Sequence, residues 1–168
     1  LTEVLRQHVK LLGREELNTA PVYLPDGSVG IVDMMLSKRV PRNAETEREH
    51  LVIELKRPDV KLDLDVEVQI RKYATAVAND ERFRSTDTRW TFWAVSNELD
   101  RTLQRSIEDQ ADRENGLVMF KEVPRIRVWI KTWGQLIEAS RARFATVQRA
   151  LDYSVTRDDA VERLRTVY

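Results

Sequence analysis

Apolar side chains recur at helical spacing in several stretches of the chain. The first stretch holds Leu1, Val4, Leu5, Val9, Leu11 and Leu12. This spacing predicts a helix, and Gly13 would end it. Further helices are predicted from a cap at Asp63 or Asp65 to about Ala78, over residues 101–113, and from Gly134 to Tyr168.

Shorter apolar runs predict strands. PVYL and SVGIVDMMLSKRV flank PDG, whose proline fixes φ and whose glycine frees it, so residues 21–40 are expected to form a hairpin. The polar segment PRNAETERE, residues 41–49, is expected to be a loop. Further strands are expected at HLVIELK, TRWTFWAVSNEL, LVMFKEV and RIRVWIKTW. This order of elements indicates an α/β fold with a mixed sheet.

Two charged residues interrupt the apolar run HLVIELKRPDV, residues 50–60. On a strand, Glu54 and Lys56 share one face with Val52, and the other face is expected to build the core. Charges set into an apolar strand must pair, stay hydrated or bind a ligand. An ion pair at the edge of the sheet and a binding site therefore both remain open.

A second acid stands in the strand before it. Asp33 is a lone carboxylate within GSVGIVDMML. If the strands around Asp33 and Glu54 pair, the two carboxylates converge, and hard oxygen ligands with open coordination positions suit Mg²⁺. The ammonium of Lys56 would then lie beside them, where it can stabilise negative charge on a phosphate.

The next predicted helix carries two more polar groups. Gln69 and Tyr73 are four residues apart in QIRKY, so they lie on one helical face and can support the same site. The alternative is a solvated Gln69 and a Tyr73 that packs in the core.

Composition excludes several classes of protein. The 168 residues suit a single domain over residues 1–168, and no apolar stretch is long enough to span a bilayer. The chain has no cysteine and two histidines, which excludes disulfides and thiolate sites and disfavours a histidine-rich zinc site. The lack of a signal-like start favours the cytoplasm. The net charge of zero neither predicts nor excludes binding to phosphates.

These residues together resemble a known family. Asp33, then E-L-K at 54–56, then Q-x-x-x-Y at 69–73 are similar to the PD-(D/E)XK nuclease superfamily, in the exonuclease-like branch of helicase-linked recombination nucleases. TRWTFWAVSNELD and VWIKTWGQLIEASRARF look like defence-associated nuclease domains of prokaryotes, which are often appended to a larger chain with a GHKL-type ATPase. No proline precedes Asp33, which is a departure from the pattern.

The resemblance implies a restriction-endonuclease-like core, with a mixed central sheet flanked by helices. It implies an Mg²⁺-dependent nuclease, with Mn²⁺ as a substitute, that acts on DNA rather than RNA in anti-phage defence or DNA processing. Asp33 and Glu54 would hold the metal, and Lys56, Gln69 and Tyr73 would complete the catalytic set. Members of this branch often add an acid from the first helix.

For that acid Glu3 is the candidate, with Glu15 and Glu16 as rivals. Because the chain begins at Leu1 inside a helical phrase, it is expected to be the C-terminal fragment of a longer protein with a linked N-terminal domain; a homo-oligomer stays open. Two alternatives to a nuclease remain at this stage. One is an inactive nucleic-acid-binding or regulatory domain, and the other is an assembly module of a larger ATPase protein.

Overall fold

The structure is a computed structural model that describes residues 2, 3, 6, 20–42, 45–83, 88–110 and 114–150. It divides into two compact units, Leu1–Trp133 and Gly134–Tyr168. The single-domain expectation for residues 1–168 stays a prediction. No helix within the described ranges combines the length and the apolar character needed to cross a bilayer.

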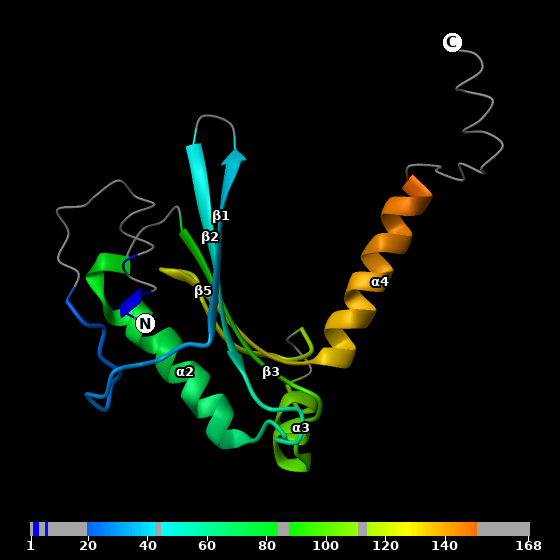
Figure 1. Cartoon of the computed structure of the whole chain (residues 1–168), viewed down its shortest axis with the longest axis horizontal. Coiled ribbons are helices and arrows are strands. Elements are labelled where there is room, and N and C mark those ends of the chain that lie inside the picture. The colour runs from blue at the N-terminus through cyan, green and yellow to red at the C-terminus, as the bar shows by residue number, and fades with distance from the viewer. Residues whose placement is uncertain are drawn as a thin grey trace, which may run out of the picture. The chain divides into compact units, whose positions relative to one another are not determined.

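The first unit is built on a five-stranded mixed sheet with the order β1-β2-β3-β5-β4 (Figure 1). Its strands are β1 (Met34–Arg42), β2 (Glu45–Leu55), β3 (Thr88–Ser96), β4 (Leu117–Lys121) and β5 (Arg125–Thr132). The central strands β2, β3 and β5 are parallel, and β1 and β4 pair antiparallel at the two edges. The expected α/β class and mixed sheet are confirmed.

The strands β1 and β2 are longer than the sequence pattern suggested. The expected loop over residues 41–49 is wrong, because β1 runs to Arg42 and β2 starts at Glu45. Lys38 pairs with Glu49 across the ladder, and its Nζ lies 2.8 Å from the Glu49 carboxylate. Cross-strand charge pairs of this kind let a polar sequence form strand. Pro41 is tolerated because β1 is an edge strand.

The predicted hairpin at PDG is confirmed at its turn. Gly27 N donates to Leu24 O over 2.9 Å, and Tyr23 and Val29 form an isolated antiparallel bridge. Gly27 has φ of 80°, the left-handed conformation that glycine adopts without steric cost. The pairing does not extend further, because β1 pairs with β2 instead.

The helix α2 (Leu64–Asn79) lies along one side of the sheet (Figure 1). Asp63 is its N-cap, as predicted, and accepts a hydrogen bond from Val66 N over 2.9 Å. The helix α3 (Arg101–Glu108) is capped in the same way by Asp100, and it ends before the predicted residue 113. The second unit holds most of α4 (Trp133–Ala150).

The core lies on the face of the sheet that α2 covers. Val52, Phe92 and Val128 follow one another across three strands on this face, and each is fully buried. Ile70, Ala74 and Val77 of α2, with Leu103 of α3, belong to the same core cluster.

The expectation that the opposite face of β2 builds the core is therefore wrong. Val52, Glu54 and Lys56 all point to the face that α2 covers, and Val52 belongs to the core there. The reason is topological. A helix that connects two parallel strands, here β2 and β3, covers the face that the handedness of the crossover selects, whatever the pattern of the strand.

Several predictions fall partly outside the described residues. Of the opening helix, only positions 2, 3 and 6 are described, and they are helical. Of the predicted C-terminal helix, α4 confirms the part to Ala150, and the rest lies outside the described residues. The short helix η1 (Glu81–Phe83) follows α2 and was not predicted.

Two glycines with positive φ offer a matched test of the fold. Gly116 has φ of 88°, and a Cβ there would stand 2.5 Å from the backbone oxygen of Ile130. A Cβ on Gly27 would have no neighbouring atom within 4 Å. Gly27→Ala should cost about 1–2 kcal/mol of unfolding free energy for the left-handed conformation alone. Gly116→Ala should cost about 1–3 kcal/mol more, because β4 or β5 must shift. Urea denaturation of both variants measures the difference, and equal losses would contradict the close approach.

Candidate active site

Asp33 and Glu54 lie at the same end of the β1–β2 ladder. The register ends with the pair Met34 and Ile53, and Asp33 and Glu54 are the next residues beyond that pair. Asp33 Oδ2 accepts a hydrogen bond from the backbone N–H of Leu55 over 2.7 Å, which fixes the carboxylate at this point. Asp33 is thus anchored at the end of β2, to the residue that follows Glu54 in the chain, and the convergence of the two carboxylates on one metal stays a prediction.

Glu54 carries a carboxylate into the covered face of the sheet, where the residue is only 7% exposed. A buried charge without partners costs several kcal/mol, so it needs compensation. Lys56 Nζ donates to Glu54 Oε1 over 2.9 Å, and Gln69 Nε2 donates to the same oxygen over 3.0 Å. One oxygen of Glu54 is thus satisfied by one cation and one amide.

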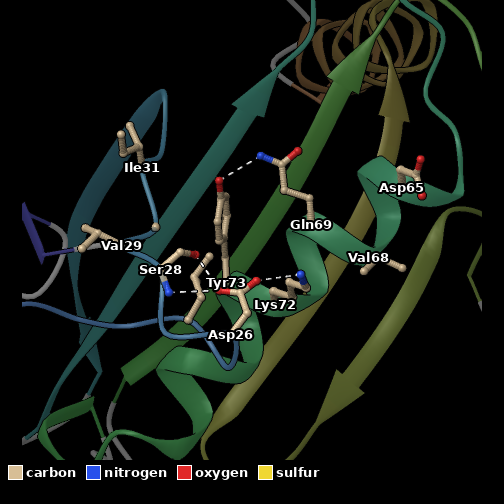
Figure 2. A pocket seen from close by; sticks show the side chains of 11 residues that line it. Asp26, Ser28, Val29, Ile31, Asp65, Val68, Gln69, Lys72 and Tyr73 are labelled. Atoms are coloured by element: carbon tan, nitrogen blue, oxygen red, sulfur yellow. Dashed lines mark hydrogen bonds and ion pairs between the residues drawn. The ribbon is translucent and has the colours of Figure 1, made fainter.

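Gln69 connects this pair to α2. Its amide oxygen accepts a second hydrogen bond from Lys56 Nζ over 2.9 Å, and its nitrogen also donates to Tyr73 OH over 2.9 Å. Figure 2 shows Gln69 and Tyr73 joined across one turn of α2. The four-residue spacing thus places both polar ends at one site, as predicted.

The alternative interpretations, an ion pair of Glu54 with Lys56 and a core position for Tyr73, are also correct in part. Glu54 and Lys56 do form an ion pair, and Tyr73, 4% exposed, does belong to the core. Gln69, however, is hydrogen-bonded to three side chains rather than merely solvated. The five residues Asp33, Glu54, Lys56, Gln69 and Tyr73 make up the candidate active site and are called the active-site cluster.

The active-site cluster keeps free hydrogen-bonding capacity. Among the described residues, none donates a hydrogen bond to Asp33 Oδ1 or to Glu54 Oε2. The phenol of Tyr73 accepts from Gln69, and no described group accepts its hydrogen. Two carboxylate oxygens and one hydroxyl donor thus remain for a ligand.

These free oxygens fit a small hard cation. Mg²⁺ is typically held by one or two carboxylates and keeps several water molecules, so it does not need a complete protein cage. Asp33 Oδ1 and Glu54 Oε2 are carboxylate oxygens of this type without a hydrogen-bond donor among the described residues. Within the described part of the chain, no three acidic or histidine side chains are grouped closely enough to hold an ion.

The structure does not bring Glu3 to this pair of acids. Glu3 is exposed, and its Oε2 accepts from Arg6 Nη1 over 3.0 Å. Glu15 and Glu16 lie outside the described residues. A third acidic ligand from the N-terminal segment stays a prediction.

Tyr73 is held in its neutral form. Burial raises the pKa of the phenol above its ordinary value, and the carboxylates of Glu54 and Asp33 act in the same direction. The hydrogen bond from Gln69 and the charge of Lys56 oppose this rise in the pKa without reversing it. At neutral pH, Tyr73 is therefore a hydrogen-bond donor and not a base.

A depression of about 530 Å³ adjoins the active-site cluster, and the sequence patterns did not reveal it. Figure 2 shows its walls: the turn after Leu24 on one side and α2 on the other. Lys72 Nζ of α2 lies 2.8 Å from Asp26 Oδ2 of the turn and joins the two walls. A signal was present, since Asp65, Val68, Gln69 and Lys72 follow the i, i+3, i+4, i+7 spacing of one helical face.

The raised pKa of Tyr73 gives a titration that can be measured. The protonated Tyr73 phenol stabilises the folded state. This contribution is fully present below the pKa of tyrosine in the unfolded chain, about 10, and is lost as the pH rises through the higher pKa of the folded state. Ultraviolet absorbance of tyrosinate should therefore show a late step in the folded protein that Tyr73→Phe removes. Tyr23→Phe, at an exposed tyrosine, is the matched control and should keep the late step. A late step that survives Tyr73→Phe would contradict the assignment.

The chain was compared with models of known protein families, with curated proteins and with solved structures, and none of the three comparisons found a match. The likeness to PD-(D/E)XK nucleases therefore rests on the residues of the active-site cluster and their order along the chain.

Proposed function

We propose that this chain is a metal-dependent nuclease that hydrolyses phosphodiester bonds in DNA. One observation carries the proposal: Glu54, at the end of β2, and Lys56, just after it, are joined by hydrogen bonds to Gln69 of α2 and through it to Tyr73, while Asp33, just before β1, is bonded to the neighbouring Leu55 N. Neither an ion pair at a sheet edge nor an assembly surface requires free carboxylate oxygens beside a lysine and a neutral phenol.

Asp33 and Glu54 are proposed to hold Mg²⁺ or Mn²⁺ through their free oxygens. The absence of sulfur ligands and of clustered imidazole favours hard ions of this kind. A bound Mg²⁺ would supply Lewis-acid charge at a phosphate oxygen and would lower the pKa of a coordinated water. The hydrogen bond from Leu55 N leaves Asp33 Oδ1 as the oxygen that is available for the metal.

Lys56 is proposed to stabilise the negative charge that develops on the phosphate during attack. Its ammonium is held by Glu54 and Gln69, so its position is set before a substrate arrives. Preorganised charges of this kind contribute to catalysis because they need no rearrangement in the transition state. An ammonium has three hydrogens, and two are donated to these partners, which leaves one for a phosphate oxygen.

Gln69 and Tyr73 are proposed as supporting groups. Gln69 orients both Glu54 and Lys56 through its amide, so it fixes the distance between the metal ligand and the cation. Tyr73 can donate its free hydrogen to a substrate oxygen or to a water molecule. Their loss should slow cleavage without emptying the metal site.

The proposal also covers the protein family and the biological process in which the nuclease would act. The antiparallel β1–β2 pair, the crossover through α2 and the parallel β3 are compatible with a restriction-endonuclease-like core of the PD-(D/E)XK type. From the resemblance of TRWTFWAVSNELD and VWIKTWGQLIEASRARF we further propose a role in prokaryotic anti-phage defence or DNA processing, as part of a larger ATPase protein. The rival proposal, a binding domain without catalysis, differs from ours in the outcome of one experiment.

That experiment is removal of the Lys56 ammonium. Lys56→Ala should lower single-turnover cleavage of plasmid DNA in Mg²⁺ by about 10²–10³-fold, the usual effect of losing one preorganised stabilising group. DNA affinity in Ca²⁺ should change little, because other basic residues carry the backbone contacts. Lys56→Arg should restore little activity, since a planar fork does not replace a compact ammonium.

The control for Lys56 is Lys61→Ala, which removes an exposed lysine that pairs with Glu98 at 2.7 Å. This variant should cleave like the wild type. Wild-type cleavage by Lys56→Ala would overturn the proposed role of Lys56, and a wild type that binds DNA without cleaving it would favour the binding domain.

A second test addresses the metal site. Asp33→Asn keeps an acceptor for Leu55 N but removes the charge, so the local fold should survive while affinity for Mn²⁺ falls by at least about tenfold. Isothermal titration calorimetry measures this change. Asp59→Asn, in the exposed turn after β2, is the control and should bind Mn²⁺ normally. Undiminished affinity in Asp33→Asn would place the metal elsewhere.

A further inference from the structure

The depression beside the active-site cluster has an apolar wall that faces solvent. Ile31 is 78% exposed, and Val29 and Val68 are each about half exposed. They come from two elements, the segment after the turn and α2, yet they line one depression (Figure 2). Aliphatic side chains that gather at an exposed hollow are typical of ligand-binding surfaces.

The depression is continuous with the active-site cluster. Gln69 and Tyr73 line it, and the same two side chains are hydrogen-bonded to each other and, through Gln69, to Glu54 and Lys56. A phosphate that meets Lys56 therefore places its neighbouring nucleotide next to this depression. The volume of about 530 Å³ lies within the range of pockets that bind small molecules.

The depression is also lined by the ammonium of Lys72, which can exchange its carboxylate partner for a phosphate. Lys72 pairs with Asp26, and both side chains are almost half exposed. Exposed ion pairs of this kind contribute little to stability, so a phosphate can take over the ammonium at low cost. Ser28 Oγ and Ser28 N also donate to Asp26, so the carboxylate keeps partners when Lys72 leaves it.

We propose that this depression binds one unpaired base of a DNA strand next to the cleaved phosphate. Ile31 and Val68 contact the base, and Lys72 contacts an adjoining phosphate. The inference rests on the proposed nuclease function, because the phosphate at Lys56 sets the position of the base. A base inside a duplex is stacked and paired, and it enters such a pocket only after its pairing and stacking are broken. The site therefore favours unpaired DNA.

The test uses two isosteric or smaller polar changes, Ile31→Thr and Val68→Thr, alone and together. The matched controls are Ile137→Thr and Val147→Thr on α4, where the side chains are also exposed; Val68 is 51% exposed and Val147 is 53%. Each variant is assayed on one sequence in three forms: single-stranded, duplex with an unpaired end, and blunt duplex. Binding is followed in Ca²⁺ with 2-aminopurine at successive positions of the strand, since its fluorescence rises when the base leaves the stack.

The wild type should cleave unpaired DNA faster than blunt duplex, and the double variant should reduce this preference by about fivefold while blunt-duplex cleavage stays unchanged. The fluorescence rise at one position should be lost in the same variant and kept in both controls. Lys72→Ala should weaken binding of all three forms and reduce its salt dependence. An unchanged preference and an unchanged fluorescence rise in the double variant would overturn the base site.

Failure of the base site and failure of the nuclease proposal give different results. If the wild type cleaves all forms but the Thr variants match it, the base site is wrong and the nuclease stands. If no form is cleaved in Mg²⁺ or Mn²⁺ while the fluorescence rise depends on Ile31 and Val68, the base site stands and the nuclease is wrong.

Discussion

The organisation of the site depends on the burial of one carboxylate. Glu54 is placed on the covered face of the sheet, in line with Val52, where only 7% of the residue is exposed to water. A carboxylate with so little exposure needs partners that offset the cost of burying its charge. Lys56 follows two residues later on the same strand face, and Gln69 must reach the same oxygen from α2. The position of α2 along the sheet is thereby tied to the site.

The register of β1 against β2 is the second constraint. A slip of one residue would turn every side chain of β1 to the other face and would remove Asp33 from Glu54. The hydrogen bond from Leu55 N to Asp33 extends the ladder by a side chain where the backbone pairing ends. The strand pairing and this hydrogen bond thus hold Asp33 beside the end of β2, where Glu54 lies.

Tyr73 contributes both to the hydrophobic core and to the candidate site. Its ring belongs to the same core cluster as Ile70, Ala74 and Val77, and its hydroxyl accepts a hydrogen bond from Gln69. The same burial that stabilises the helix raises the pKa of the phenol and keeps it protonated. A side chain with both tasks cannot be replaced by a larger or more polar one without loss of packing.

The elements of the site could be predicted from the sequence where a local rule decides. Asp63 predicted the start of α2, because an N-cap hydrogen bond involves only the next few residues. The four-residue spacing of Gln69 and Tyr73 predicted that they lie on one helical face. Asp33 and Glu54 stood out because carboxylates are costly within apolar strands. Charge pairing between β1 and β2 leaves no such local signal, so the polar sequence PRNAETERE predicts a loop although most of it is strand.

The sequence by itself therefore determined which residues are chemically unusual and on which elements they lie. Only the tertiary structure decided which face of β2 is covered, because that depends on the crossover through α2 and not on the alternation of the strand. It also decided that Asp26 of the turn meets Lys72 of α2, and that Ile31 and Val68 line one depression. These residues are distant in the chain, and no local periodicity records a contact that arises only when a turn and a helix pack over the same sheet.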